Sequence, residues 1–206
     1  RNDTLYARSY ASTLTAVVKA AAQPRDYDPY YARARRYLAA AAVDANGNVV
    51  IALAGVACER AEALHKARRF PEALTSYEVA VAGLMELFTR EPQADQGLRW
   101  LTHARIGAAR ALSSQGKNAE SLVFWNAAYA DAKDMPVSQR LDRAKVMALV
   151  GHVDDTIQVM AQIDLNNEAY NFVKAAAIYA VLAKSAQAPT RQKLEDQAMD
   201  WLSHRP

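Results

Sequence analysis

Residues 105–128, RIGAARALSSQGKNAESLVFWNAA, constrain the fold of this chain more than any other stretch. Apolar residues recur three and four apart on both sides of Gly116, which predicts two amphipathic helices joined by a tight turn. Small residues fall where the two helices cross, and bulky ones are expected to pack beside them: Ala108, Ala109, Ser121 and Ala128, then Leu112, Leu122 and Trp125. One such hairpin leaves an apolar face uncovered, so we expect the rest of the chain to supply neighbouring hairpins.

The composition favours helix along most of the chain. Ala is abundant in the 206 residues, whereas Gly and Pro number 7 each and leave few positions to punctuate a sheet. Apolar spacing and breaks at Pro, Gly and Asn predict the following helices: 4–22, 29–45, 49–69, 70–91, 100–115, 118–133, 139–150, 154–163, 170–183 and 190–202. In this interpretation Asn46, Gly47 and Asn48 end the second helix.

An internal period supports the hairpin interpretation. Gly116 and Gly151 are 35 residues apart, and Ala109 and Ala144 each lie seven residues before one of them. Arg68 holds the same turn position in an earlier unit, with Ala61 seven residues before it. In the second helices, Ala73, Tyr77 and Ala80 match Ser121, Trp125 and Ala128. The period defines units of about 54–91, 102–136, 138–165 and 169–203.

The segments ERAEALHKARRFPEALTSYEVAV and ARIGAARALSSQGKNAESLVFWNAA resemble tetratricopeptide repeats (TPR), with small, aromatic and small residues at the places typical of that family. The resemblance implies an all-α fold, a right-handed solenoid of helical hairpins over 49–206, with two extra N-terminal helices in 1–48 packing on the array. The chain departs from the family in two ways. The first two turns, at Arg68 and Gly116, are 48 residues apart, and Thr156 and Ile163 replace small residues in the third unit.

Residues 99–125, followed by VGHVDDTIQVMAQI and YNFVKAAAIYAVLAKSAQ, also resemble the repeat-bearing C-terminal regions of bacterial serine/threonine protein kinases. That resemblance implies a regulatory or docking region whose catalytic domain lies outside these residues. The alternative is an accessory scaffold of a bacterial envelope assembly or secretion system, where similar arrays occur. The full-length gene would distinguish the two, and these residues leave both open.

In the tetratricopeptide family the first helices of successive repeats line a concave groove that binds partner proteins. Carrying the groove positions onto this sequence gives Glu62, His65, Lys66, His103, Arg110, Ser114 and Lys145. Cations predominate in this set, so we expect a protein or peptide partner with some acidic character, held by Arg110 and Lys145. The alternative, that the chain's own N-terminal helices fill the groove, stays open.

No motif in the chain predicts catalysis, a cofactor or a metal site. Glu62 and His65 have Glu-x-x-His spacing, but a second such motif and two further Glu are absent, so the pair is interpreted as surface residues. Cys58 and His65 lie two helical turns apart, about 10 Å by rise, too far for a nucleophile and its base. We therefore expect a non-catalytic chain, with Cys58 in the core.

Charge and hydropathy bear on two further classes of partner, nucleic acid and membrane. Residues 1–70 carry 11 Lys and Arg against 6 Asp and Glu, whereas 71–206 carry 14 against 16. This mild basic excess does not favour nucleic acid, because Arg33, Arg35 and Arg36 spread around their helix. The longest apolar run, 49–58, is half of what a membrane span needs, so no membrane insertion is expected. The compartment and oligomeric state stay open, with the cytoplasm favoured over the periplasm.

Overall fold

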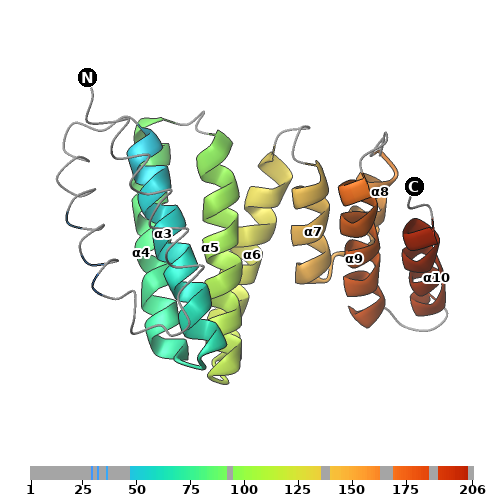
Figure 1. Ribbon diagram of the computed structural model, residues 1–206, viewed down its shortest axis with the longest axis horizontal. Coiled ribbons are helices and arrows are strands. Elements are labelled where there is room, and N and C mark those ends of the chain that lie inside the picture. Colours follow the sequence, from blue (N-terminus) through green and yellow to red (C-terminus); the bar gives the residue numbers. More distant parts are fainter. Residues whose placement is uncertain are drawn as a thin grey trace. The chain divides into compact units, whose positions relative to one another are not determined.

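The computed structural model describes Pro29, Ala32 and Arg36 and residues 47–91, 95–135, 140–162, 169–185 and 190–203. Within these residues the chain is helical and contains no strand, which confirms the all-α prediction (Figure 1). The helices are α3 (Gly47–Lys66), α4 (Phe70–Arg90), α5 (Asp95–Ser114), α6 (Asn118–Asp134), α7 (Arg140–Val150), α8 (Val153–Met160), α9 (Ala169–Ser185) and α10 (Thr190–Ser203).

Most helix boundaries agree with the sequence-based expectations to within two or three residues. Helix α5 is the exception, because it begins at Asp95, five residues before the expected start. The expectation that Gly47 and Asn48 terminate a preceding helix is wrong, since both residues lie in the first turn of α3. The helical pair expected in 1–48 otherwise lies outside the described residues, except that Pro29, Ala32 and Arg36 are helical and exposed.

The chain divides into two compact units, Arg1–Ala128 and Tyr129–Pro206, and the boundary falls within α6. In the first unit α3 packs against α4, and α5 packs against both. In the second unit α7 packs against α8, α9 packs against α7 and α8, and α10 packs against α9. Within each unit, the helices of these successive pairs are therefore neighbours in space.

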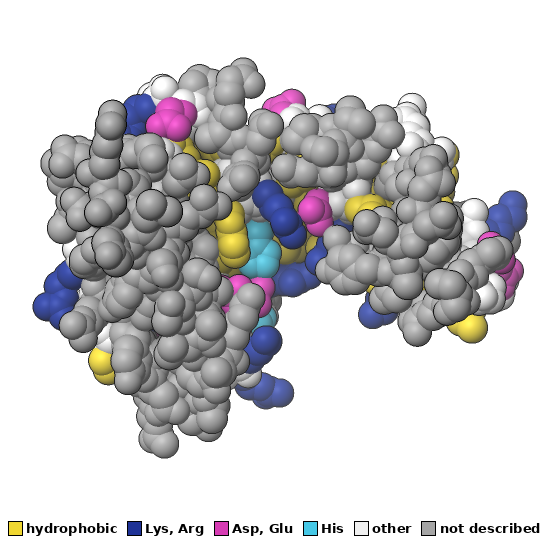
Figure 2. Space-filling view, turned by 45° about the horizontal axis from the view of Figure 1, so that its top comes forward, with side chains coloured by type: hydrophobic (Ala, Val, Ile, Leu, Met, Phe, Trp, Pro, Cys, Tyr) yellow, Lys and Arg dark blue, Asp and Glu magenta, His cyan; other side chains and the backbone are white. Residues whose placement is uncertain are grey.

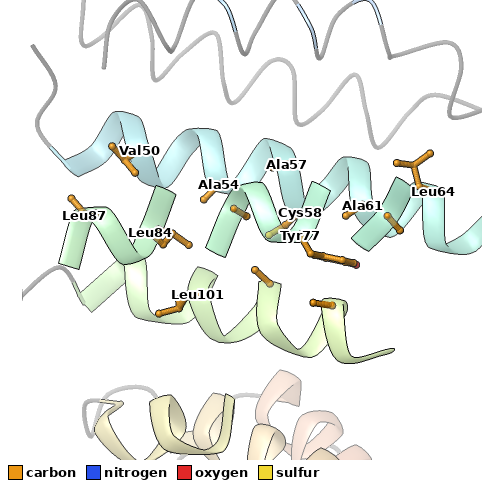
Figure 3. Packing of buried hydrophobic residues seen from close by; sticks show 14 residues of the cluster. Val50, Ala54, Ala57, Cys58, Ala61, Leu64, Tyr77, Leu84, Leu87 and Leu101 are labelled. Atoms are coloured by element: carbon orange, nitrogen blue, oxygen red, sulfur yellow. The ribbon is translucent and has the colours of Figure 1, made fainter. Parts of the chain in front are cut away.

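The core of the first unit lies between α3, α4 and α5 (Figure 3). Helix α3 contributes mainly small side chains, whereas α4 contributes large ones that fill the space beside them. The fully or almost fully buried members of this cluster include Ala54, Ala57, Cys58, Ala61, Leu64, Ala73, Tyr77, Ala80, Leu84, Leu87, Leu101, Ala104 and Ala108. The small residues let the helix backbones approach closely, and each large apolar side chain removed from water contributes about 1.5–3 kcal/mol.

Three helix-to-helix turns have the same hydrogen-bond pattern. Arg68, Gly116 and Gly151 have positive φ angles of 59°, 76° and 88°. The next residue in each turn donates its backbone N–H to a carbonyl five residues earlier: Arg69 to Leu64, Lys117 to Leu112 and His152 to Met147, at 2.9, 3.0 and 3.0 Å. A left-handed residue followed by such a bond is the Schellman ending of a helix. The sequence period therefore corresponds to a repeated turn geometry at these three places.

The small positions of the repeat are buried as the sequence period requires. Ala61 and Ala109 are fully buried. Thr156, which departs from the family pattern, is also fully buried. Its hydroxyl donates a hydrogen bond to the carbonyl of His152 at 2.7 Å. The extra polar atom of this threonine is thus satisfied within its own helix, and the position tolerates it.

The expectation that Leu122 packs between the hairpin helices is wrong. Its neighbour Ser121 faces α5 and donates to the carbonyl of Ala109 at 2.9 Å. Successive residues of a helix point about 100° apart, so Leu122 turns away from α5 and is 60% exposed. Trp125, three residues further on, is half-buried, and Leu112 on α5 is buried as expected.

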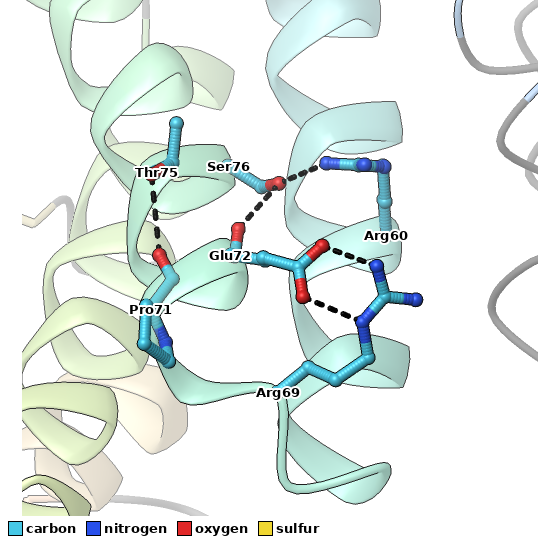
Figure 4. Close-up of polar contacts among 6 residues, drawn as sticks. All are labelled: Arg60, Arg69, Pro71, Glu72, Thr75 and Ser76. Atoms are coloured by element: carbon cyan, nitrogen blue, oxygen red, sulfur yellow. Dashed lines mark hydrogen bonds and ion pairs between the residues drawn. The ribbon is translucent and has the colours of Figure 1, made fainter.

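Polar contacts fix the α3–α4 turn (Figure 4). The Arg69 guanidinium donates two hydrogen bonds to the carboxylate of Glu72, one of them at 2.7 Å, in the first turn of α4. Arg60 on α3 donates to the hydroxyl of Ser76 on α4 at 2.7 Å, and that hydroxyl donates to the carbonyl of Glu72 at 3.1 Å. These bonds link the C-terminal half of α3 and the turn after it to the first turns of α4.

Candidate protein-binding face of α3 and α5

Six of the seven residues expected to line a groove lie on α3 and α5. Glu62, His65 and Lys66 are three and four residues apart, so their side chains share one face of α3. His103, Arg110 and Ser114 are seven and four apart and share one face of α5 in the same way. Because α3 and α5 pack against each other, the two faces can meet.

Glu62 and His103 join the two helices. Nε2 of His103 lies 3.0 Å from Oε1 of Glu62, with the two side chains 43% and 39% exposed. The imidazole also stands edge-on to the Trp100 ring, with centroids 5.7 Å apart and planes at 90°. One turn of α5 therefore presents an aromatic ring and an imidazole together, and the imidazole is held toward the carboxylate of α3. Figure 2 shows His side chains lying against acidic ones on the surface of the molecule.

The surroundings of Glu62 favour its charged form. The hydrogen bond from His103 is the largest influence and lowers the pKa of the Glu62 carboxyl, and the charges of His103, Lys66 and Arg110 lower it further. Partial burial acts in the opposite direction but is outweighed. Glu62 is thus an anion surrounded by cationic groups from both helices.

The surroundings of His65 favour its neutral form. Its ring packs edge-on to Phe70, with centroids 5.0 Å apart. Burial lowers the pKa of the His65 imidazole most, and the charge of Arg110 lowers it as well, against the opposing charge of Glu62. Arg110 on α5 therefore acts electrostatically on both Glu62 and His65 of α3. These residues form one shared electrostatic site, which we name the α3–α5 face: Glu62, His65, Lys66, Trp100, His103 and Arg110.

Two expected groove residues fall outside this cluster. Ser114 is exposed at the C-terminal end of α5. Lys145 is exposed on α7 and belongs to the second unit. Trp100, in contrast, was not among the expected groove residues. Its position three residues before His103 on a helix was the signal that could have found it.

The α3–α5 face offers hydrogen-bonding and charged groups without an activated nucleophile among its described residues. Cys58 is fully buried beneath it, and burial, with the nearby charges of Glu62 and Glu59, raises the pKa of its thiol. Burial likewise raises the pKa of the Tyr77 phenol. Within the part of the chain that the structure describes, no three His, Cys, Asp or Glu side chains are grouped so that they could hold a metal ion.

A second polar cluster, which the sequence did not indicate, joins α6 to the start of α8 within the second unit. The rings of Tyr129 and His152 stack with centroids 3.7 Å apart and planes within 6°. The Tyr129 hydroxyl donates to the carboxylate of Asp155, and the ammonium of Lys133 lies 4.4 Å from the Tyr129 ring centroid. These contacts link the two helices, and the stacking and cation–π geometry is that of a stabilising surface cluster.

The fold and the face define an all-α protein of helical hairpins that pack in sequence order. On α3 and α5 it exposes a mixed surface with two cations, Lys66 and Arg110, and one anion, Glu62. Comparison with models of known protein families, with characterised proteins and with solved structures finds no match. Across the described ranges, the longest apolar stretch of any helix falls short of what crossing a membrane requires.

Proposed function

We propose that this chain is a non-catalytic protein-binding scaffold, and that the α3–α5 face binds a peptide or helix of a partner protein bearing carboxylates. One observation carries the proposal. Glu62, the acidic member of the face, is already hydrogen-bonded to His103, while Lys66 and Arg110 are exposed beside it. The face therefore has a surplus of positive charge that an acidic partner would neutralise.

The chemistry of the face suits a carboxylate ligand. A guanidinium such as that of Arg110 can donate two parallel hydrogen bonds to one carboxylate, which fixes the orientation of the ligand. An exposed ion pair alone contributes only about 0.2–1 kcal/mol, so affinity also requires apolar contact. The half-buried ring of Trp100, next to His103, supplies an aromatic surface for that contact.

The shared turns at Arg68, Gly116 and Gly151 support a tetratricopeptide-like solenoid as the framework of this scaffold. In that arrangement α3, α5, α7 and α9 would be the first helices of successive repeats, and Lys145 on α7 is a separate candidate contact within the second unit. The proposal includes a regulatory region of a bacterial serine/threonine kinase as its biological setting. Sequencing the gene on both sides of this segment tests that setting.

Affinity capture from the native organism tests the binding face. The intact chain, a Lys66→Ala/Arg110→Ala variant and a Lys145→Ala variant serve as baits, and recovered proteins are quantified by mass spectrometry. We expect the double variant to lose acidic partners by about tenfold, because two charge-assisted contacts are removed. Glu62→Gln should increase their recovery, since it removes the one anion of the face.

Lys117→Ala is the matched control, because Lys117 is an exposed cation in the α5–α6 turn, away from the α3–α5 face. This control should recover the same partners as the unchanged chain. Equal recovery by the double variant and the unchanged chain would contradict the proposal, as would reduced recovery with Glu62→Gln.

A further inference from the structure

A groove between α9 and α10 is a second candidate surface, independent of the α3–α5 face. It has a volume of about 710 Å³ and is mainly apolar. Alanines from both helices line it, together with Met199, which is 65% exposed: Ala176, Ala177, Ala180 and Ala183 on α9, and Ala198 on α10. Lys184, Arg191 and Glu195 stand at its rim.

In each unit a helix packs on the apolar face of the hairpin before it. In the first unit α5 packs against both helices of the α3–α4 hairpin, and its Leu101, Ala104 and Ala108 are buried among their small residues. In the second unit α9 packs against both helices of the α7–α8 hairpin. A helix therefore covers the face of a preceding hairpin in both units, whereas the α9–α10 groove stays open within the described structure.

The residues that line the α9–α10 groove indicate what kind of partner would fit it. Alanine side chains on α9 let a helix backbone approach closely, as the alanines of α3 do for α5. An exposed methionine adapts its shape to different apolar partners. At the rim, two cations face one anion, and Arg191 is oriented by donating from Nε to the carbonyl of Ala183 at 3.1 Å. The exposed Lys184 on the same rim favours a carboxylate.

We infer that the α9–α10 groove is a docking site for an amphipathic helix of a partner protein, with small apolar residues along one face and carboxylates at the edge that meets Lys184. The helix lies along the groove as α5 lies along the α3–α4 hairpin. Affinity comes from burial of Met199 and of the exposed Ala177 and Ala180, and the carboxylates set the orientation of the helix.

The probe is a fluorescent synthetic peptide about as long as α9, with Ala and Leu three and four apart and Glu on both flanks of that stripe. A peptide of the same composition, scrambled so that no apolar face forms, is its control. Binding to the full chain is followed by fluorescence anisotropy. An environment-sensitive dye on Met199→Cys gives a second readout, and it labels selectively because Cys58 is fully buried.

Ala180→Arg places a long charged side chain in the groove and should weaken binding of the amphipathic peptide by at least about tenfold. Ala82→Arg makes the same change at an exposed position of α4 and should leave binding unchanged. Lys184→Gln should weaken binding a few-fold, and only for the peptide with Glu flanks rather than Gln flanks. Circular dichroism checks that Ala180→Arg folds, and Met199→Lys replaces it if it does not.

Equal affinities for the amphipathic and scrambled peptides would overturn the inference, and so would the absence of binding to both. Unchanged binding after Ala180→Arg would overturn it as well. A blue shift of the dye at position 199 with the amphipathic peptide alone would support it. None of these outcomes depends on Lys66 or Arg110, so failure here is separable from failure of the α3–α5 face.

Discussion

Gly107 of α5 lies directly against the ring of Tyr77 of α4 (Tyr77 is labelled in Figure 3). A β-carbon added to Gly107 would stand 2.2 Å from Cζ and 2.3 Å from Cε1 of Tyr77, far inside van der Waals contact. The Tyr77 ring is itself held in the core and is only 3% exposed. The spacing of α4 and α5 therefore depends on the absence of a side chain at position 107.

Replacing Gly107 by Ala should destabilise the first unit. The added methyl group forces the Tyr77 ring or the α5 backbone to move, and such overpacking costs about 1–3 kcal/mol of unfolding free energy. Gly83→Ala is the matched control, because the nearest atom to its added β-carbon would be 3.8 Å away. Alanine is also the better helix former by about 1 kcal/mol, so this control should be neutral or stabilising. Urea unfolding measures both, and equal effects would refute the contact.

Arg68→Gly should stabilise the protein. Arg68 occupies the left-handed region with φ of 59°, where Gly116 and Gly151 occupy the two equivalent turns. A side chain at such a position costs about 1–2 kcal/mol that glycine does not. Gly116→Ala should therefore destabilise by a similar amount, although nothing lies within 4 Å of its added β-carbon. Thermal unfolding of the two variants should shift in opposite directions, and shifts of the same sign would argue against the shared turn geometry.

Leu64 and Leu122 should respond differently to the same truncation. Leu64 is fully buried, so Leu64→Ala should cost about 2–5 kcal/mol through lost burial and the cavity left behind. Leu122 is 60% exposed, and Leu122→Ala should change the free energy of unfolding by less than about 0.5 kcal/mol. Urea denaturation of both variants tests the prediction. A large loss with Leu122→Ala would mean that α6 buries the residue that the periodicity first indicated.

The sequence predicted the hairpin turns well because their cause is local. Gly116 and Gly151 mark positions that need a positive φ, and the spacing to Ala109 and Ala144 places the buried crossing seven residues earlier. The same period also predicted a turn at Arg68, although arginine has no preference for a positive φ. Burial at the edge of a helix face was less predictable, since Leu122 lies one residue from the buried Ser121.

The α3–α5 face was predicted as a set of residues but not as a set of contacts. The hydrogen bond between Glu62 and His103 depends on the register of two helices separated by all of α4, and no local pattern encodes that register. Glu62 and His65 share a helix face as their spacing requires, yet the partner of Glu62 comes from α5. Tertiary packing therefore determined the hydrogen bond between Glu62 and His103, while local periodicity determined which residues were available for it.

Acidification should weaken the fold in two separate pH ranges, through His65 and then Glu62. The pKa of His65 is lowered in the folded state, chiefly by burial, so the unfolded chain takes up its proton first as pH falls below about 6.5. The pKa of Glu62 is lowered chiefly by the His103 hydrogen bond. The stability that Glu62 contributes is fully present above its unfolded pKa of about 4.3 and is lost as pH falls through its folded pKa.

Urea unfolding across pH 4 to 8, extended downward while the fold persists, separates the two residues. His65→Gln should flatten the loss of stability that begins below about pH 6.5 and leave the lower range unchanged. Glu62→Gln should flatten the range below about pH 4.3, because glutamine cannot titrate. Glu86→Gln is the control for a surface carboxylate, since Glu86 is 75% exposed and lies 3.9 Å from Arg90. If Glu62→Gln and Glu86→Gln gave the same pH profile, the His103 contact would not stabilise the folded state.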